Sequence, residues 1–212
     1  MEQVLVKEKN KVAVKNKLSV KQKLVERVLQ KQVQIVKLKE WLAVGGFVLG
    51  AAALRSAMQI APSVEPITFF ALLGGWLFGK KKGFLIGAGA LYASNFLVFG
   101  GQGFWTPFQA LGFGLAGVLG GFLSKKAKLW SVFLMTLLAT IVFEIIVNLG
   151  MFFLFPNLLA AIPFIIIHLV SNGVFSFLLP GAKNLVNTKG KFDQKEICNK
   201  LLQKFESFKG GK

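Results

Sequence analysis

The chain has 212 residues, of which 54% are apolar, and it carries a formal charge of +17 at pH 7. The apolar share exceeds the roughly 45–50% of an average soluble domain. The charge is concentrated at the ends: residues 1–40 hold 11 basic and 4 acidic side chains, residues 181–212 hold 8 and 3, and residues 41–180 hold only 7 and 2. A central segment as apolar as residues 41–180 excludes an ordinary cytosolic enzyme. The single cysteine, Cys198, excludes a disulfide-built secreted domain.

Residues 1–40 are a basic arm in which we expect a cationic amphipathic helix over residues 19–40. Ser19 and Gln22 have the spacing of a capping box, and apolar residues recur after them near helical spacing. Attraction of such a helix to anionic lipid is on the order of 1 kcal/mol per basic residue near the surface. Nucleic acid is the alternative partner, but no aromatic residue for base stacking precedes Trp41. We therefore favour lipid or protein contact, and we expect no signal peptide because the arm lacks an apolar h-region.

The middle of the chain contains six apolar segments that we expect to cross a membrane as helices. A helix of about 20 mainly apolar residues spans a hydrocarbon core of roughly 30 Å. The second segment is short, with 14 residues from Pro66 to Gly79, so it must tilt or borrow flanking residues. The six segments are residues 41–61, 66–79, 83–100, 105–124, 129–154 and 158–179.

Lysine placement predicts which way this bundle faces. The turns after the second and fourth segments carry six lysines, whereas the turns after the first, third and fifth carry no lysine or arginine. The positive-inside rule places those lysines and both basic ends in the cytoplasm. We therefore expect an all-α, multi-pass protein of the plasma membrane with both termini cytoplasmic. Its parts are the basic arm over 1–40, a six-helix domain over 41–182, and a basic tail over 183–212 that includes a short solvated helix.

The first apolar segment has a stripe of small residues along one side of the expected helix. Arg55 lies on the opposite side, about 200° from Ala53 at 100° per residue, and Gln59 follows Arg55 one turn later. Because a charge facing lipid costs at least a few kcal/mol, Arg55 should point into the bundle and the stripe outward. Small residues allow close helix packing, so the stripe suits the docking of another protein. Ordinary internal packing is the alternative, since the third and fourth segments have similar stripes. The members are Gly46, Gly50, Ala53, Ala57 and Ala61.

These features resemble the S component of energy-coupling factor (ECF) transporters, which has six spans, both ends inside, a series of alanines on its first span and no nucleotide-binding motif. Here the series is Ala53, Ala57 and Ala61. The stretch from Glu65 and Pro66 through LLGGWLFGKKKG to SNFLVFGGQGFWTPFQ is similar to that family too. The resemblance covers residues 41–182, and the lysine-rich arm departs from the family pattern.

The resemblance implies a subunit of an ABC-type importer that captures a vitamin or related nutrient from outside the cell. It implies no catalytic activity and no cofactor or metal of its own. It also implies docking, through the three alanines, on a membrane T subunit that two cytosolic ATPases drive. Which vitamin is captured stays open among flat rings such as riboflavin or thiamine, a corrinoid and a modified base.

Polar side chains inside the expected spans mark the candidate ligand site, because an intramembrane ionisable group is a functional candidate by default. Most of them fall in the outer half of the membrane, under the outer loops. Arg55 and Glu144 are alternatively a buried ion pair between the first and fifth spans. His168 is alternatively a core histidine, and the asparagines are alternatively contacts between helices. The candidates are Arg55, Gln59, Asn95, Trp105, Gln109, Glu144, Asn148 and His168.

The loop over residues 100–107 combines three glycines with two aromatic rings, and we expect it to act as a gate over the ligand. Its expected gate residues are Gly101, Gly103 and Phe104, because glycine permits positive φ and Phe104 and Trp105 offer flat stacking surfaces. No Gly-Lys-Ser/Thr ending follows, which argues against a phosphate-binding loop. Trp105 is alternatively a residue of an interfacial aromatic belt.

Two other functions compete with substrate capture. An intramembrane serine protease is one, since His168 and Asn172 have a suitable spacing. However, the sequence has no Gly-x-Ser-Gly, and neither Ser94 nor Ser171 has the surroundings of an activated nucleophile. A self-driven carrier is the other, and the lack of an evident internal repeat disfavours it.

Overall fold

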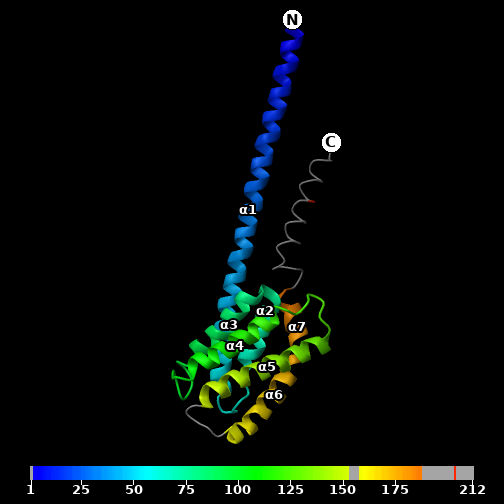
Figure 1. The fold of residues 1–212 in the computed structure, drawn as a ribbon. Coiled ribbons are helices and arrows are strands. Elements are labelled where there is room, and N and C mark those ends of the chain that lie inside the picture. The colour runs from blue at the N-terminus through cyan, green and yellow to red at the C-terminus, as the bar shows by residue number, and fades with distance from the viewer. Residues whose placement is uncertain (1, 153–157, 188–202, 204–212) are drawn as a thin grey trace. The chain divides into compact units, whose positions relative to one another are not determined.

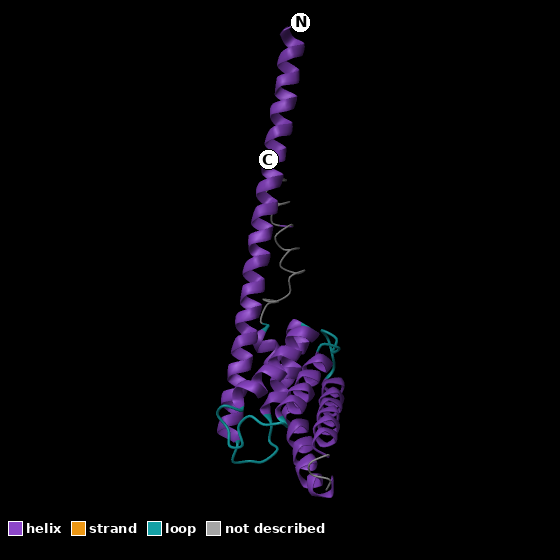
Figure 2. Ribbon diagram, turned by 60° about the vertical axis from the view of Figure 1, so that its left-hand side comes forward, coloured by secondary structure: helices purple, strands orange, loops and turns teal. Residues whose placement is uncertain are grey.

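The computed structural model describes residues 2–152, 158–187 and 203. The chain divides into two compact units, one of Glu40–Lys189 and one of Met1–Lys39 with Gly190–Lys212. The described elements are all helices, and no strand occurs among the described residues (Figure 2). The predicted all-α class is therefore confirmed for that part of the chain.

Each expected apolar segment contains a helix, although several bounds differ from the prediction (Figure 1). The elements are α1 (Glu2–Met58), α2 (Pro66–Phe78), α3 (Lys80–Ser94), α4 (Thr106–Gly120), α5 (Leu129–Phe152), the 3-10 helix η1 (Leu158–Ala161), α6 (Ile162–Ser176) and α7 (Leu179–Val186). The amphipathic helix expected over 19–40 is part of α1. Apart from α7, the helix expected in the tail lies outside the described residues.

The third helix differs most from its predicted range of 83–100, since α3 runs from Lys80 to Ser94. It begins early because Gly79 is the single residue between α2 and α3. Gly79 has φ +88°, a conformation that glycine adopts without steric cost. It ends early because residues after Asn95 turn back in a loop, with the N–H of Leu97 donating to the carbonyl of Ser94 at 2.8 Å.

Three helices among the described residues are long and apolar enough to cross a membrane: Gln30–Met58, Leu129–Phe152 and Leu159–Ser176. The helices α2, α3 and α4 have 13, 15 and 15 residues, or roughly 20–22 Å at 1.5 Å per residue. Each is shorter than a hydrocarbon core of roughly 30 Å. The structure therefore indicates a membrane-associated protein with three long apolar helices.

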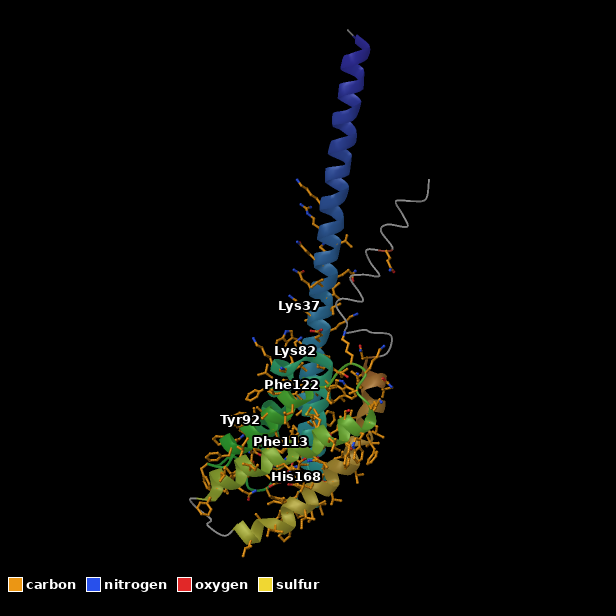
Figure 3. The ribbon with its side chains drawn as sticks, turned by 45° about the vertical axis from the view of Figure 1, so that its right-hand side comes forward. Lys37, Lys82, Tyr92, Phe113, Phe122 and His168 are labelled. Atoms are coloured by element: carbon orange, nitrogen blue, oxygen red, sulfur yellow. The ribbon has the colours of Figure 1, made fainter. Side chains whose placement is uncertain are left out.

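The two turns that carry lysines lie together at one end of the bundle. Trp76 Nε1 donates to the carbonyl of Ser124 at 2.7 Å, and Lys80 Nζ lies 3.3 Å from the centre of the Phe122 ring. Figure 3 shows Phe122 toward this lysine end and His168 toward the opposite end. Helices that alternate in direction bring the turns after the second and fourth segments to the same end of the bundle. The contacts between these two turns agree with that expectation.

Lysines in the first turn of α3 stand where the helix macrodipole disfavours positive charge. Lys82 Nζ forms an ion pair with Glu40 on α1 and lies 5.6 Å from the centre of the Trp41 ring. These contacts offset the unfavourable position. At the same end, burial and the neighbouring Lys125 lower the pKa of Lys183, whose Nζ lies 3.9 Å from the centre of the Trp76 ring.

Glycines bring α2, α3 and α4 together at backbone distance. A Cβ on Gly117 would lie 2.0 Å from the carbonyl oxygen of Gly83, and one on Gly87 would lie 2.0 Å from that of Phe113. A Cβ on Gly75 would lie 1.9 Å from the carbonyl oxygen of Gly117. The small-residue stripes of α3 and α4 are therefore internal packing surfaces, as small residues commonly are in membrane bundles.

Candidate functional site

Arg55 is the centre of a polar group that we call the Arg55 cluster, made of Arg55, Glu65, Ser94, Asn95 and Thr106. Arg55 Nε lies 3.1 Å from Glu65 Oε2. Its Nη1 donates to Ser94 Oγ at 2.8 Å and to Asn95 Oδ1 at 2.7 Å. Asn95 Nδ2 in turn donates to Thr106 Oγ1 at 3.2 Å. The cluster thus ties the end of α1 to the starts of α2 and α4 and the end of α3.

The expected alternative of an ion pair between Arg55 and Glu144 is wrong. Glu65 directly precedes α2, and the short connection after α1 brings it back to Arg55 only ten residues later. Glu144 on α5 has a different partner, because its Oε1 lies 2.6 Å from His168 Nδ1. The two intramembrane charges of the sequence prediction therefore belong to separate sites.

Glu144 is the centre of a second polar group, the Glu144 cluster, made of Glu144, Asn148 and His168. Asn148 Nδ2 donates to Glu144 Oε2 at 2.9 Å, so both carboxylate oxygens have a partner. His168 is 1% exposed and lies edge-on to the ring of Phe143, with 5.0 Å between ring centres. Its Nε2 is buried without a hydrogen-bond partner in the described part of the chain. All three residues are ligand-site candidates of the sequence analysis, and the structure brings them together.

A groove of about 360 Å³ opens beside the Glu144 cluster, between α5 and α6. Its polar lining comes from Glu144 and Asn148. Its apolar lining consists of Ile141, Ile145, Leu149, Ile165 and Leu169. The groove therefore combines one carboxylate and one amide with isoleucine and leucine walls.

Three other polar candidates lie outside both clusters. Gln59 Oε1 accepts from the N–H of Phe99 at 3.2 Å, which links the end of α1 to the loop after α3. Gln109 Oε1 is buried and has no hydrogen-bond partner among the described residues. Asn172 Nδ2 donates to Thr140 Oγ1 at 3.0 Å. Asn172 therefore connects α6 to α5, which is the contact between helices that was the alternative to ligand binding.

The loop between α3 and α4 is fastened at several points. Gln102 Nε2 donates to the carbonyl of Tyr92 at 2.8 Å, and the N–H of Gly103 donates to Thr106 Oγ1 at 3.0 Å. Positive φ occurs at Gly100 and Gly101 but not at Gly103. Gly103 instead makes room for Trp105, whose ring would lie 2.5 Å from a Cβ there.

The ring of Phe104, the third expected gate residue, lies edge-on to that of Trp105, with 5.1 Å between centres. Phe104 is 45% exposed, so its side chain stands at the surface of the loop. The aromatic pair is therefore formed within the loop itself, next to the residues that fasten it to Thr106.

Four small residues of α1 lie on the face opposite to Arg55. Ala51 and Ala52 are buried, whereas Gly46, Gly50, Ala53 and Ala57 are exposed. A Cβ on Gly46 would meet nothing within 4 Å. We call the four exposed residues the α1 small-residue face. It is outward, as the position of Arg55 predicts.

Ala61, the fifth expected member of that stripe, is not on the helix. The helix α1 ends at Met58, and the N–H of Ala61 donates to the carbonyl of Met58 at 2.9 Å in the turn that follows. The reason is Pro62, because a proline disfavours helical backbone in the residue before it.

Sequence reasoning missed Glu65, Ser94 and Thr106 as members of the Arg55 cluster. One signal was available for Glu65, which is one of only two acidic residues between positions 41 and 180. A buried arginine needs an acidic partner, and Glu65 is the nearer of the two along the chain. Hydroxyl side chains give no such signal, because they are common in membrane helices.

The described residues contain no group of three or more histidine, cysteine, aspartate or glutamate side chains that fits a metal ion. Ser171 Oγ donates to the carbonyl of His168 at 3.1 Å and to that of Ser63 at 3.3 Å. Its hydroxyl is thus bonded to backbone carbonyls and not to the imidazole. This arrangement lacks the hydrogen bond between nucleophile and base that serine chemistry uses.

Removing the charge of Glu65 should destabilise the bundle. Loss of one partner from a buried ion pair typically costs 3–5 kcal/mol. The Glu65 side chain is 21% exposed, so we expect the Glu65→Gln variant to lose about 2 kcal/mol in the free energy of unfolding. Unfolding of the purified protein in detergent would measure the loss. A second replacement, Arg55→Met, should recover part of it, and unchanged stability of Glu65→Gln would show that the pair contributes little.

The sequence profile of a family of unknown function, DUF6580, matches residues 36–195. The match spans more than half of the chain, including all of the compact unit Glu40–Lys189. The chain therefore belongs to this family. No curated protein and no solved structure matches it.

Proposed function

We propose that this protein is the substrate-capture subunit of an importer of the energy-coupling factor type, in the plasma membrane. In this role it crosses the membrane six times with both termini in the cytoplasm, binds a vitamin or related nutrient from outside, and has no catalytic activity. The observation that carries the proposal is the α1 small-residue face, which is exposed while Arg55 on the other side of the same helix is bonded inward.

The contrast with α3 and α4 supports docking at this face. In α3 and α4, four glycines lie against backbone oxygens of neighbouring helices, where a Cβ would come within 2.0–2.4 Å: Gly83, Gly87, Gly117 and Gly120. In α1, a Cβ on Gly46 would meet nothing, and one on Gly50 would lie 3.9 Å from Phe70. A smooth face that is exposed among the described residues suits a helix of another subunit. That subunit is the T subunit, which two cytosolic ATPases drive.

The position of the polar groups supports capture from the outer side. The lysine end faces the cytoplasm under the positive-inside rule. His168 lies toward the other end of the bundle (Figure 3). The Arg55 cluster joins Asn95 at the end of α3 to Thr106 at the start of α4, next to the loop between these helices. The short helices α2, α3 and α4 cross the membrane together with the turns that flank them. The fastened loop between α3 and α4 and the buried polar side chains then form the outer part of the bundle.

Native mass spectrometry of the full chain purified from its host membranes tests this proposal. We expect one small molecule bound per chain, no turnover of that molecule, and a second population in which the chain is bound to a T subunit and two ATPases. Conversion of the bound molecule would indicate an intramembrane enzyme instead. Energised uptake by the chain alone in proteoliposomes would indicate a self-driven carrier. Either result would overturn the proposal.

A further inference from the structure

The groove between α5 and α6 presents a carboxylate to an otherwise apolar space. Its volume of about 360 Å³ lies in the usual range of small-molecule sites, roughly 300–1,000 Å³. The Glu144 side chain is 15% exposed, and Ile145 beside it in the lining is 53% exposed. The groove is therefore accessible from the surface of the bundle.

Both oxygens of the Glu144 carboxylate have a partner within the cluster. Oε1 lies 2.6 Å from His168 Nδ1, and Oε2 accepts from Asn148 Nδ2 at 2.9 Å. The carboxylate is therefore held in one position at the edge of the groove. Glu144 is the one acidic side chain among the described residues that line the groove.

No basic side chain within the described ranges lines the groove. Arg55 is bonded to Glu65, Ser94 and Asn95, and Lys82 lies at the opposite end of the bundle from His168 (Figure 3). An ionised carboxylate in a membrane helix is expensive without a positive partner. A cationic group in the groove would supply that partner.

We propose that the groove binds an organic cation, with an ammonium group against Glu144 and Asn148 and an apolar body against the isoleucine and leucine walls. The inference rests on the proposed capture function and names the chemical class of the captured ligand. The groove lining offers one carboxylate and one amide, and the described residues contain no group of three or more His, Cys, Asp or Glu side chains that could hold a metal ion. A zwitterionic phospholipid carries a phosphate next to its ammonium group, and Glu144 would repel that phosphate.

A matched series of three probes tests the inference on the full chain in phosphatidylcholine nanodiscs. The probes 4-phenylbutylammonium, 4-phenylbutanol and 4-phenylbutyrate share one apolar body and differ in the charge of the head group. Isothermal titration should show saturable binding of the ammonium probe at least tenfold tighter than that of the alcohol, and no binding of the carboxylate. Equal affinities of the ammonium and the alcohol, or preference for the carboxylate, would overturn the inference.

Two variants locate the binding. Glu144→Gln should weaken binding of the ammonium probe at least tenfold and leave the affinity for the alcohol unchanged. Ile145→Trp fills the groove without a change of charge and should abolish binding of both, whereas Leu138→Trp, two turns earlier on α5 and 46% exposed, should change neither. Undiminished binding in Ile145→Trp would contradict the groove. If a neutral or anionic compound co-purifies with the chain and the ammonium probe fails, the ligand class is wrong while the capture function stands.

Discussion

Replacing Ala57 with tryptophan should abolish uptake by the assembled transporter and leave ligand binding by the isolated protein unchanged. Ala57 is exposed on the α1 small-residue face, away from both polar clusters, so the larger side chain has room in the isolated chain. At a helix interface that depends on close approach, the indole would hold the two backbones apart. Transport of labelled substrate into cells and binding by the purified chain are the two measurements.

Two further variants show whether size at the docking face is the cause. Ala57→Gly keeps the face smooth and should retain uptake. Leu138→Trp adds the same indole to an exposed position of α5 and should also retain it. If Ala57→Trp transports normally, the docking face is assigned to the wrong side of the bundle. If Ala57→Trp loses ligand binding as well, the effect is on folding and docking is not its explanation.

Charge placement made the arrangement of the helices predictable from sequence. The six lysines between the spans are grouped in two turns, and the structure joins those turns through Trp76, Ser124, Lys80 and Phe122. The orientation of α1 was predictable for the same reason, since a single arginine in an apolar helix has to face inward. Both inferences use the cost of placing charge in lipid, which can be judged from the residue type without knowing its partners.

Partners across helices were not predictable, because the spacing of residues along one helix does not reveal which residues of another helix they contact. Arg55 had two possible acidic partners in the apolar middle. The sequence offered Glu144 on α5 as the alternative to ligand contact, whereas Arg55 is bonded to Glu65. The length of α3 was misjudged for a related reason. Apolar residues continue from Phe96 to Phe99, yet these residues form a folded loop. In it the N–H of Phe99 donates to Gln59, and Gln102 donates to the carbonyl of Tyr92.

The three short helices should depend on glycine more strongly than α1 does. In Gly117→Ala the new Cβ would lie 2.0 Å from the carbonyl oxygen of Gly83, and backbone atoms cannot move aside as a flexible side chain can. The helices α3 and α4 must separate, so we expect a loss of about 3 kcal/mol in the free energy of unfolding, the upper end of the usual cost of overpacking.

Gly45→Ala is the matched control, because Gly45 is also helical and a Cβ there would meet nothing within 4 Å. It should be neutral or slightly stabilising, since alanine favours a helix over glycine by about 1 kcal/mol. Unfolding of both variants in the same detergent separates helix propensity from packing. Equal stability of the two variants would mean that α3 and α4 are held together by side chains of other residues. A loss confined to Gly117→Ala would place the contact at the backbones, and it would explain how helices too short to span a membrane alone form one packed layer.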